Sequence, residues 1–495
     1  MDKENLNGIP EEETEEIKKC SYCGSGEAAE GSEYCDLCEA KLLKKRIPVF
    51  GWIAGFVSLI LSVVVFVVLV AGTLITPWFS KGDKYADEKI WHMAYEQYYN
   101  DYVESVENLN VINDLLNRVF ETEERAYVSP SLGIRKKMIN VIANYYGPLD
   151  AYYYATGFLS EKEIAMPFMQ QNTRMYQEFQ STYAVAEETF NSAFEEGADY
   201  KKILAEMDAH KGKEGVNEVF LNYNKYVIAV NLGATVTEQL EILGDIEKAA
   251  AASGDDYSWL CNPALAPALY DAGKTDETMV YLDKIIAANK SSYDAYRLKM
   301  MIQVMNGEVE AAGETVAEFR KNHENIELAY YADILEIEYL RITGDYDKAE
   351  ALCTEADESF RNVSETNAIM DLTYMMESKL IMPTEIYRQR ALVLMTVGRY
   401  DEAFQSMMEA YQLESYYAQY LQGETSLNDP KFYGTLYLSA ILVEQNGMIT
   451  EENRPDVEMI LETFGKGKIS DDIEAVKNGT KTVKEVLTEG EFEAV

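Results

Sequence analysis

The sequence predicts an all-α protein in which helices pack against helices. Only 11 Pro and 29 Gly occur among 495 residues, too few for the frequent turns of an all-β protein. The 36 Tyr and 20 Met residues suit the packed faces of helices. Apolar side chains also recur every three or four residues over a long stretch after residue 90, as they do along one face of a helix.

The charge of the chain excludes one large class of function. With 85 Asp and Glu against 44 Lys and Arg, the formal net charge is -41, so we expect no nucleic-acid partner. Only three His residues occur, and the sequence contains no nucleophile elbow, phosphate loop or HExxH motif. We therefore expect a protein that is not an enzyme.

An uncharged stretch at 47–79 predicts a single transmembrane helix. Its apolar part is long enough to cross the roughly 30 Å hydrocarbon core of a bilayer. Trp52 and Trp78 flank it where interfacial aromatic residues belong, and Pro77 ends the helix. A signal peptide is the alternative, but 46 residues precede this segment.

The flanking charges predict the orientation of this helix. A compact basic run stands at 41–46, whereas the lysines after the span are spread out and mixed with acids. We therefore expect a single-pass protein of the cell membrane with a cytoplasmic N-terminus, including an acidic disordered tail at 1–17, and an extracellular C-terminal domain. That exported part carries nearly all of the acidic excess.

Four of the six cysteines form two CxxC pairs before the span, namely Cys20, Cys23, Cys35 and Cys38. Two such pairs facing each other can complete a tetrahedron of thiolates, so the spacing predicts structural Zn²⁺ with no open coordination position. Thiolates persist in a reducing cytosol, which agrees with the charge bias. Two disulfides in an exported segment are the alternative.

The segment at 18–42 resembles the short bacterial zinc-ribbon domains found at the N-termini of membrane proteins. The matching residues are the four cysteines, Gly24 directly after the first pair, and Gly31. The resemblance implies that Gly24 lets the chain turn and frees backbone N–H groups toward sulfur. Glu39 departs from the pattern, because a second glycine often stands there.

The membrane-proximal region at 84–250 is expected to be helical. Apolar residues from Trp91 to Val119 recur with an average spacing of 3.5 residues, which is typical of a seam between helices. The helix at 91–119 would suit a homodimeric coiled coil, but its aromatic residues favour packing within the chain. A tyrosine cluster around Gly147 could line a ligand groove or belong to the core; it comprises Tyr145, Tyr146, Tyr152, Tyr153 and Tyr154.

A repeat appears at 258–415, marked by glycines at turns. Gly273, Gly307, Gly344 and Gly398 each end one helical run and open another, at intervals of 34, 37 and 54 residues. Around the last two the pattern is Gly-x-Tyr-Asp-x-Ala, with the alanines at 349 and 403. This region resembles a tetratricopeptide (TPR) repeat array, which implies a solenoid of helical hairpins on one transmembrane helix.

The remaining predictions concern the two exported cysteines and the function. Cys353 falls at a packing position, and a disulfide with Cys261 would have to span more than two repeats, so we expect both thiols to be free. The C-terminal segment at 416–495 is predicted to be helical with a tail. The hypothesis is a membrane-anchored scaffold that binds a protein or peptide partner; the alternative is an envelope sensor or enzyme with a pocket among the membrane-proximal tyrosines.

Overall fold

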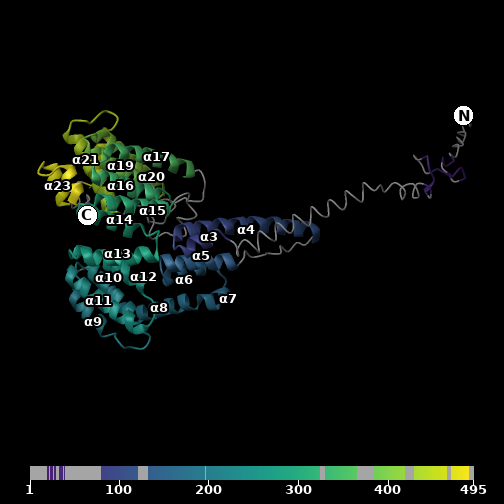
Figure 1. The fold of residues 1–495 in the computed structure, drawn as a ribbon, viewed down its shortest axis with the longest axis horizontal. Coiled ribbons are helices and arrows are strands. Elements are labelled where there is room, and N and C mark those ends of the chain that lie inside the picture. Colours follow the sequence, from purple (N-terminus) through teal and green to yellow (C-terminus); the bar gives the residue numbers. More distant parts are fainter. Residues whose placement is uncertain are drawn as a thin grey trace, which may run out of the picture. The chain divides into compact units, whose positions relative to one another are not determined.

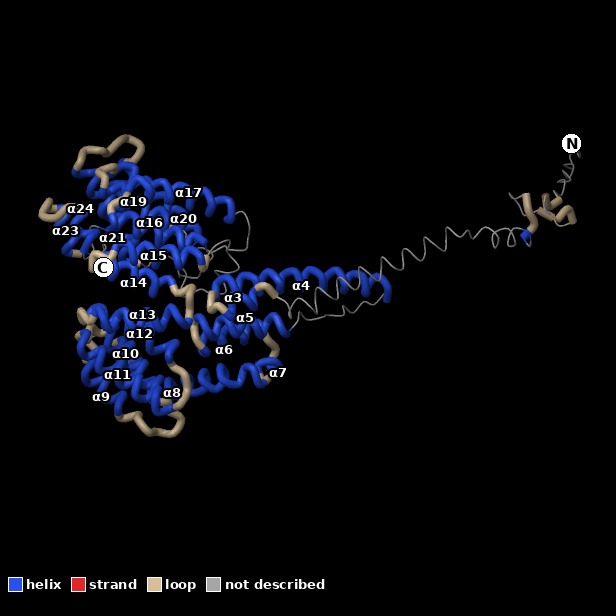
Figure 2. Tube along the Cα trace, viewed as in Figure 1, coloured by secondary structure: helices blue, strands red, loops and turns tan. Residues whose placement is uncertain are grey.

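The computed structural model describes residues 19–21, 23–25, 27–28, 33–36, 38, 80–120, 132–195, 197–323, 329–364, 384–417, 429–464 and 470–489. Among these residues all regular elements are helices, as predicted, and the only β-pairing is one isolated bridge between Lys19 and Glu27 (Figure 2). The chain divides into two compact units, one of residues 1–75 and 108–127 and one of residues 76–107 and 128–495.

The predicted tail at 1–17 and the predicted span at 47–79 lie outside the described residues. No helix in the described part of the chain combines the length and the apolar character needed to cross a bilayer.

The region after residue 80 begins with helices of unequal length. They are α3 (Gly82–Asp87), α4 (Trp91–Phe120), α5 (Leu132–Tyr145), α6 (Pro148–Phe158), α7 (Glu161–Ile164), η2 (Pro167–Met169), α8 (Gln170–Asn191), η3 (Ser192–Phe194) and α9 (Tyr200–Asp208). The start of the predicted seam is buried within the chain, because Trp91, Tyr95 and Tyr98 pack in one core with Ile134 and Met138 of α5. This is the intramolecular packing that the aromatic residues favoured.

Helical hairpins follow, and each pairs two consecutive antiparallel helices. They are α10 (Glu218–Asn231) with α11 (Val236–Ser253), α12 (Ser258–Asp271) with α13 (Thr275–Ala288), α14 (Tyr293–Met305) with α15 (Val309–Lys321), α16 (Tyr330–Thr343) with α17 (Tyr346–Ser364), α19 (Glu385–Thr396) with α20 (Tyr400–Tyr417), and α21 (Pro430–Gln445) with α22 (Arg454–Phe464). Two short helices end the described chain, α23 (Asp471–Lys477) and α24 (Val483–Glu489).

The turn glycines adopt the left-handed conformation that the sequence predicted. The φ angles of Gly273, Gly307, Gly344 and Gly398 are 71°, 80°, 89° and 82°. Residues other than glycine rarely adopt this conformation. The alanines that follow, Ala349 and Ala403, are fully buried where the two helices of a hairpin meet. Hairpins of the same kind occur on both sides of 258–415, with Gly233 and Gly447 as their left-handed turn residues.

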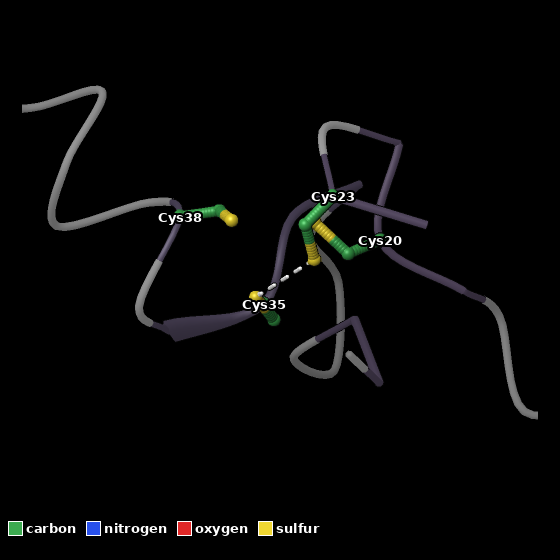
Figure 3. A group of neighbouring side chains, drawn as sticks. All are labelled: Cys20, Cys23, Cys35 and Cys38. Atoms are coloured by element: carbon green, nitrogen blue, oxygen red, sulfur yellow. Dashed lines mark hydrogen bonds between the residues drawn. The ribbon is translucent and has the colours of Figure 1, made fainter. Parts of the chain in front are cut away.

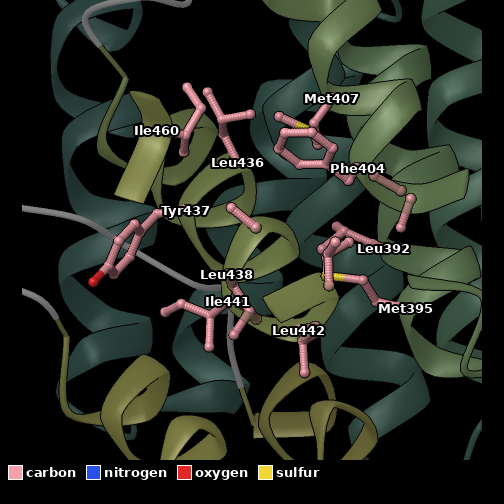
Figure 4. Close-up of a cluster of buried hydrophobic side chains, with 14 of the residues drawn as sticks. Leu392, Met395, Phe404, Met407, Leu436, Tyr437, Leu438, Ile441, Leu442 and Ile460 are labelled. Atoms are coloured by element: carbon pink, nitrogen blue, oxygen red, sulfur yellow. The ribbon is translucent and has the colours of Figure 1, made fainter. Parts of the chain in front are cut away.

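Successive hairpins stack through their first helices. Helix α14 contacts α16, α16 contacts α19, and α19 contacts α21, and Figure 1 shows these helices side by side in the larger unit. The largest core among the described residues runs from α19 to α24 and includes Leu392, Phe404, Leu436 and Ile460 (Figure 4). Cys353 lies in the neighbouring core of α14 to α17, as predicted. The fold is therefore an all-α, TPR-like array of helical hairpins.

A buried polar seam crosses three of these first helices, and we define it as Arg297, Glu338, Arg341 and Gln389. Arg297 of α14 donates two hydrogen bonds of 2.7 and 2.6 Å to the Glu338 carboxylate of α16. Arg341, also on α16, lies 3.9 Å from the same carboxylate and donates to the Gln389 amide oxygen of α19 at 3.1 Å. Glu338 is 1% exposed, so its charge depends on these partners instead of water.

The start of α4 is fastened to the turn between α13 and α14. Lys89 Nζ donates to the Ala287 carbonyl at 2.9 Å, and the Trp91 indole N–H donates to the Ala288 carbonyl at 2.9 Å. The backbone N–H of Lys290 donates to the Lys89 carbonyl at 3.0 Å. Lys89 itself has φ of 60°, so a non-glycine residue is held in a left-handed conformation at this junction. The helices before residue 250 and the hairpins from α12 onward are thus joined within one unit.

Candidate metal centre

The four predicted cysteines lie together in the smaller unit. The sulfur atoms of Cys20, Cys23, Cys35 and Cys38 are all within 4.8 Å of one another, and the Sγ atoms of Cys23 and Cys35 are 3.9 Å apart. Cys20 and Cys38 are buried, whereas Cys23 is exposed. In Figure 3 the sulfur atoms of Cys20, Cys23 and Cys35 point toward one another, and that of Cys38 faces them across the gap.

The local backbone brings each pair of thiols together through a tight turn. Gly24 has φ of 66°, and its N–H donates to the Cys20 carbonyl at 2.9 Å, which is the turning role that the ribbon resemblance implies for this glycine. In the second pair the Cys38 N–H donates to the Cys35 carbonyl at 2.8 Å. Gly31 and Glu39 lie outside the described residues.

The geometry and the chemistry of the donors fit a thiophilic metal ion. Four sulfurs at the usual Zn–S distance of about 2.3 Å stand about 3.8 Å apart at the corners of a tetrahedron, and the cysteines are close to that spacing. As free thiols they are crowded: hydrogen bonding with Cys35 and burial raise the pKa of Cys38 to about 12. A divalent cation favours thiolates. The cluster could therefore bind a metal ion such as zinc.

The two cysteines outside the cluster and the five tyrosines around Gly147 lie in the larger unit. The buried Cys261 and Cys353 are free thiols, as expected. The tyrosines do not form one groove. Tyr152 stacks on Tyr176 with ring centroids 4.2 Å apart, the Tyr154 hydroxyl lies 3.2 Å from that of Tyr95, and Tyr153 is 76% exposed.

Sequence reasoning missed a cavity of about 510 Å³ in the larger unit. Of the five tyrosines, Tyr145 alone lines it, beside Trp91 and Trp259. The sequence feature that could have indicated this cavity is the small number of tryptophans. The chain has four, and the two that are not in or beside the predicted span both line the cavity.

Neither a protein-family model nor a curated protein matches this sequence. Among solved structures, a tetratricopeptide repeat protein from Parabacteroides merdae ATCC 43184 is 14% identical, with a TM-score of 0.33 over 57% of this chain and 98% of that one. The TPR domain of P58(IPK) is 13% identical, with a TM-score of 0.20 over 74% and 97% of the two chains.

Yeast Tom70 is also 13% identical, with a TM-score of 0.27 over 77% of this chain and 90% of its own. At such low scores these likenesses carry no argument about function. The assignment of helical-hairpin repeats to this chain stands on the helix contacts and the turn glycines.

Proposed function

We propose that this protein is a membrane-anchored adaptor that holds a protein or peptide partner on its helical-hairpin array. The single observation that carries the proposal is a set of exposed apolar side chains next to the hairpin turns. Val230, Met305, Val309, Val397 and Met448 are each between 36% and 64% exposed, and each lies within three residues of a left-handed turn glycine.

These positions belong to one edge of the array, because the turns inside successive stacked hairpins recur on the same side of a solenoid. Apolar residues spread along an edge offer separate anchor points for an extended partner. The strongly acidic composition favours a partner segment with basic residues around those anchors. Since the sequence contains no catalytic motif, binding is the activity we assign to the array.

Site-specific photocrosslinking tests the adaptor proposal. A photoreactive amino acid at Val309 should capture a defined partner in intact cells, whereas one at Lys321, the opposite end of the same helix α15, should not. Lys321 is exposed as well, so accessibility is matched. Equal capture at both positions, or none at either, would contradict binding along the turn edge.

The anchoring part of the proposal rests on the sequence. The segment at 47–79 would cross the cell membrane once, with Zn²⁺ structurally bound by the four cysteines in the cytoplasm and the helical region outside. A cysteine introduced at Glu11 should be protected from a membrane-impermeant thiol reagent in intact cells, and one at Thr480 should be labelled. Peptide mapping distinguishes these sites from the native thiols, and the reverse pattern would overturn the topology.

A further inference from the structure

The cavity of about 510 Å³ is built by helices that are distant in sequence. Its walls come from the start of α4, from α5 and α6, from η2 and α8, and from α12 and α13 of the first predicted repeat. The volume lies within the range of about 300 to 1,000 Å³ that is typical of small-molecule sites. All of these elements belong to the larger unit.

Six amide side chains line this cavity. They are Asn140, Asn144, Gln171, Asn172, Asn262 and Asn289. Asn172 is only 8% exposed, yet its amide makes no hydrogen bond with the described residues. A ligand that hydrogen-bonds with this amide would use a donor and an acceptor that no described residue occupies. Asn262 and Gln171 also line the cavity.

Aromatic side chains also line the cavity, and the ring of Trp259 is fixed by its packing. Trp259 packs directly on Gly147, where an added Cβ would lie 2.2 Å from the Cε3 atom of the indole. Gly147 therefore leaves the space that the Trp259 ring fills, and its φ of 110° also excludes most other residues. Trp91 is fixed by its hydrogen bond to the Ala288 carbonyl. Such rings are pre-organised to contact a ligand.

The charges around the cavity are sparse compared with the rest of this acidic chain. The charged residues that line it are Lys89, Lys136 and Asp256. Lys89 is already engaged with the Ala287 carbonyl, Lys136 lies over the Phe168 ring at 5.5 Å, and the Asp256 carboxylate accepts from the Ser258 N–H. Neutral amides therefore supply most of the free hydrogen-bonding capacity, which favours an uncharged ligand.

We propose that this cavity binds a short oligosaccharide of N-acetylated amino sugars. Each acetamido group presents an N–H and a C=O, which match the paired acceptor and donor of an Asn side chain, and ring hydroxyls can use the remaining amides. The acetyl methyl group and the apolar face of a sugar ring suit Trp and Tyr surface. An extended peptide would also offer amide groups, but it lacks the ring hydroxyls and the apolar sugar face that suit the remaining amides and the Trp surface. The cavity is partly open and is lined by six helices and the η2 turn.

Tryptophan fluorescence of the full-length protein in detergent tests this proposal, because two of its four Trp residues line the cavity. Titration with di-N-acetylchitobiose should change the emission saturably. Cellobiose, which has the same linkage without acetamido groups, should bind at least tenfold more weakly. An N-acetylated alanine peptide should have no effect.

Variants then locate the binding to the cavity. Asn172→Leu keeps the side-chain volume and should weaken di-N-acetylchitobiose binding by roughly tenfold, since a lost hydrogen bond is worth about 1.4 kcal/mol. Asn262→Ala, at a half-buried position that tolerates truncation, should also weaken it if Asn172→Leu fails to fold. Asn231→Ala, on the exposed end of α10, should leave it unchanged.

Two outcomes would overturn the proposal. One is the absence of saturable binding of di-N-acetylchitobiose, or binding that the cavity variants leave unchanged. The other is tighter binding of the peptide than of the disaccharide, which would assign the cavity to the peptide class. Neither result affects the adaptor proposal, because Val309 and the other turn-edge residues do not line the cavity.

Discussion

At the scale of single residues, the cysteine cluster depends on all four sulfur atoms. Cys20 and Cys38 are buried, and Cys23 and Cys35 face each other at 3.9 Å. A tetrahedral site has no spare ligand, so the loss of one thiolate leaves the metal ion open to water and to competing chelators.

Replacing Cys23 by Ser should therefore abolish tight zinc binding. Full-length protein purified under reducing conditions should contain one Zn²⁺ per chain by elemental analysis, and the C23S variant should contain almost none. Cys261→Ala serves as the control, because it removes a buried thiol that lies outside the cluster. A wild-type protein without zinc, or a C23S variant that retains it, would argue against the metal site.

At the scale of helices, the closeness of paired helices depends on small side chains. Ala403 of α20 is fully buried in the core shared with α19 and α21. The packing of interiors leaves little room for additional methyl groups.

Ala403→Leu should destabilise the last hairpins by roughly 1 to 3 kcal/mol through overpacking. Because stacked hairpins couple mainly to their neighbours, amide hydrogen exchange should accelerate in α16 to α22 and stay unchanged in α4 and α5. Uniform loss of protection across all helices would mean that the larger unit unfolds as one core.

A second prediction about helices concerns the buried polar seam. Glu338→Ala should lower the free energy of unfolding by about 3 to 5 kcal/mol, because it leaves Arg297 and Arg341 without their shared carboxylate. Glu206→Ala is a matched control, since its partner Lys202 is 73% exposed and such a pair contributes less than about 1 kcal/mol. Denaturant titration measures both, and equal effects would contradict the assigned role of the seam.

At the scale of the whole molecule, a buried histidine pair connects the start of α4 with the segment that follows α15. His92 Nδ1 and His323 Nε2 are 2.9 Å apart, and the His92 ring stacks on Tyr145 with centroids 4.7 Å apart. His323 Nδ1 lies 3.0 Å from the Phe319 carbonyl, so Nδ1 carries the proton and Nε2 accepts one from His92. Burial lowers the pKa of His323 to about 4 and lowers that of His92 well below its ordinary value.

The protein should therefore lose stability as the pH falls from about 6.5 toward 4. In this window the unfolded chain binds protons at these histidines and the folded chain does not, so acid favours unfolding. For His323 alone the loss between pH 7 and pH 5 is of the order of 2 kcal/mol. Denaturant titrations at both pH values should show a smaller loss for His323→Gln. An identical pH dependence in the variant would exclude this cause.

The pH range in which the histidines affect stability is separate from the range in which the carboxylates do. Hydrogen bonds from Arg135 and Ser160 lower the pKa of Glu163 to about 2, and those within the Thr235 capping box do the same for Glu238. The stability that these depressed pKa values contribute is present above pH 4.5 and disappears as the pH falls toward 2. Measurements at pH 5 and above therefore report mainly on the histidines.

The repeats could be predicted from the sequence because their turns require particular residue types. A left-handed residue at Gly344 or Gly398 and a buried Ala after it leave a recognisable pattern, and the CxxC spacing is equally explicit. The cavity left no such pattern, because Asn172 and Trp259 come from helices whose contact only the fold creates. The outer hairpins were missed as repeats because Gly233 and Gly447 lack the x-Tyr-Asp-x-Ala that follows Gly344 and Gly398.

The polar seam also limits how this array can change in length. Repeat proteins commonly gain or lose a unit, since neighbouring units are interchangeable. Deletion of α16 and α17 would remove the Glu338 carboxylate, to which Arg297 of α14 donates two hydrogen bonds. The loss of this partner by the half-buried Arg297 would oppose that deletion. The seam therefore makes α16 specific to its place between α14 and α19.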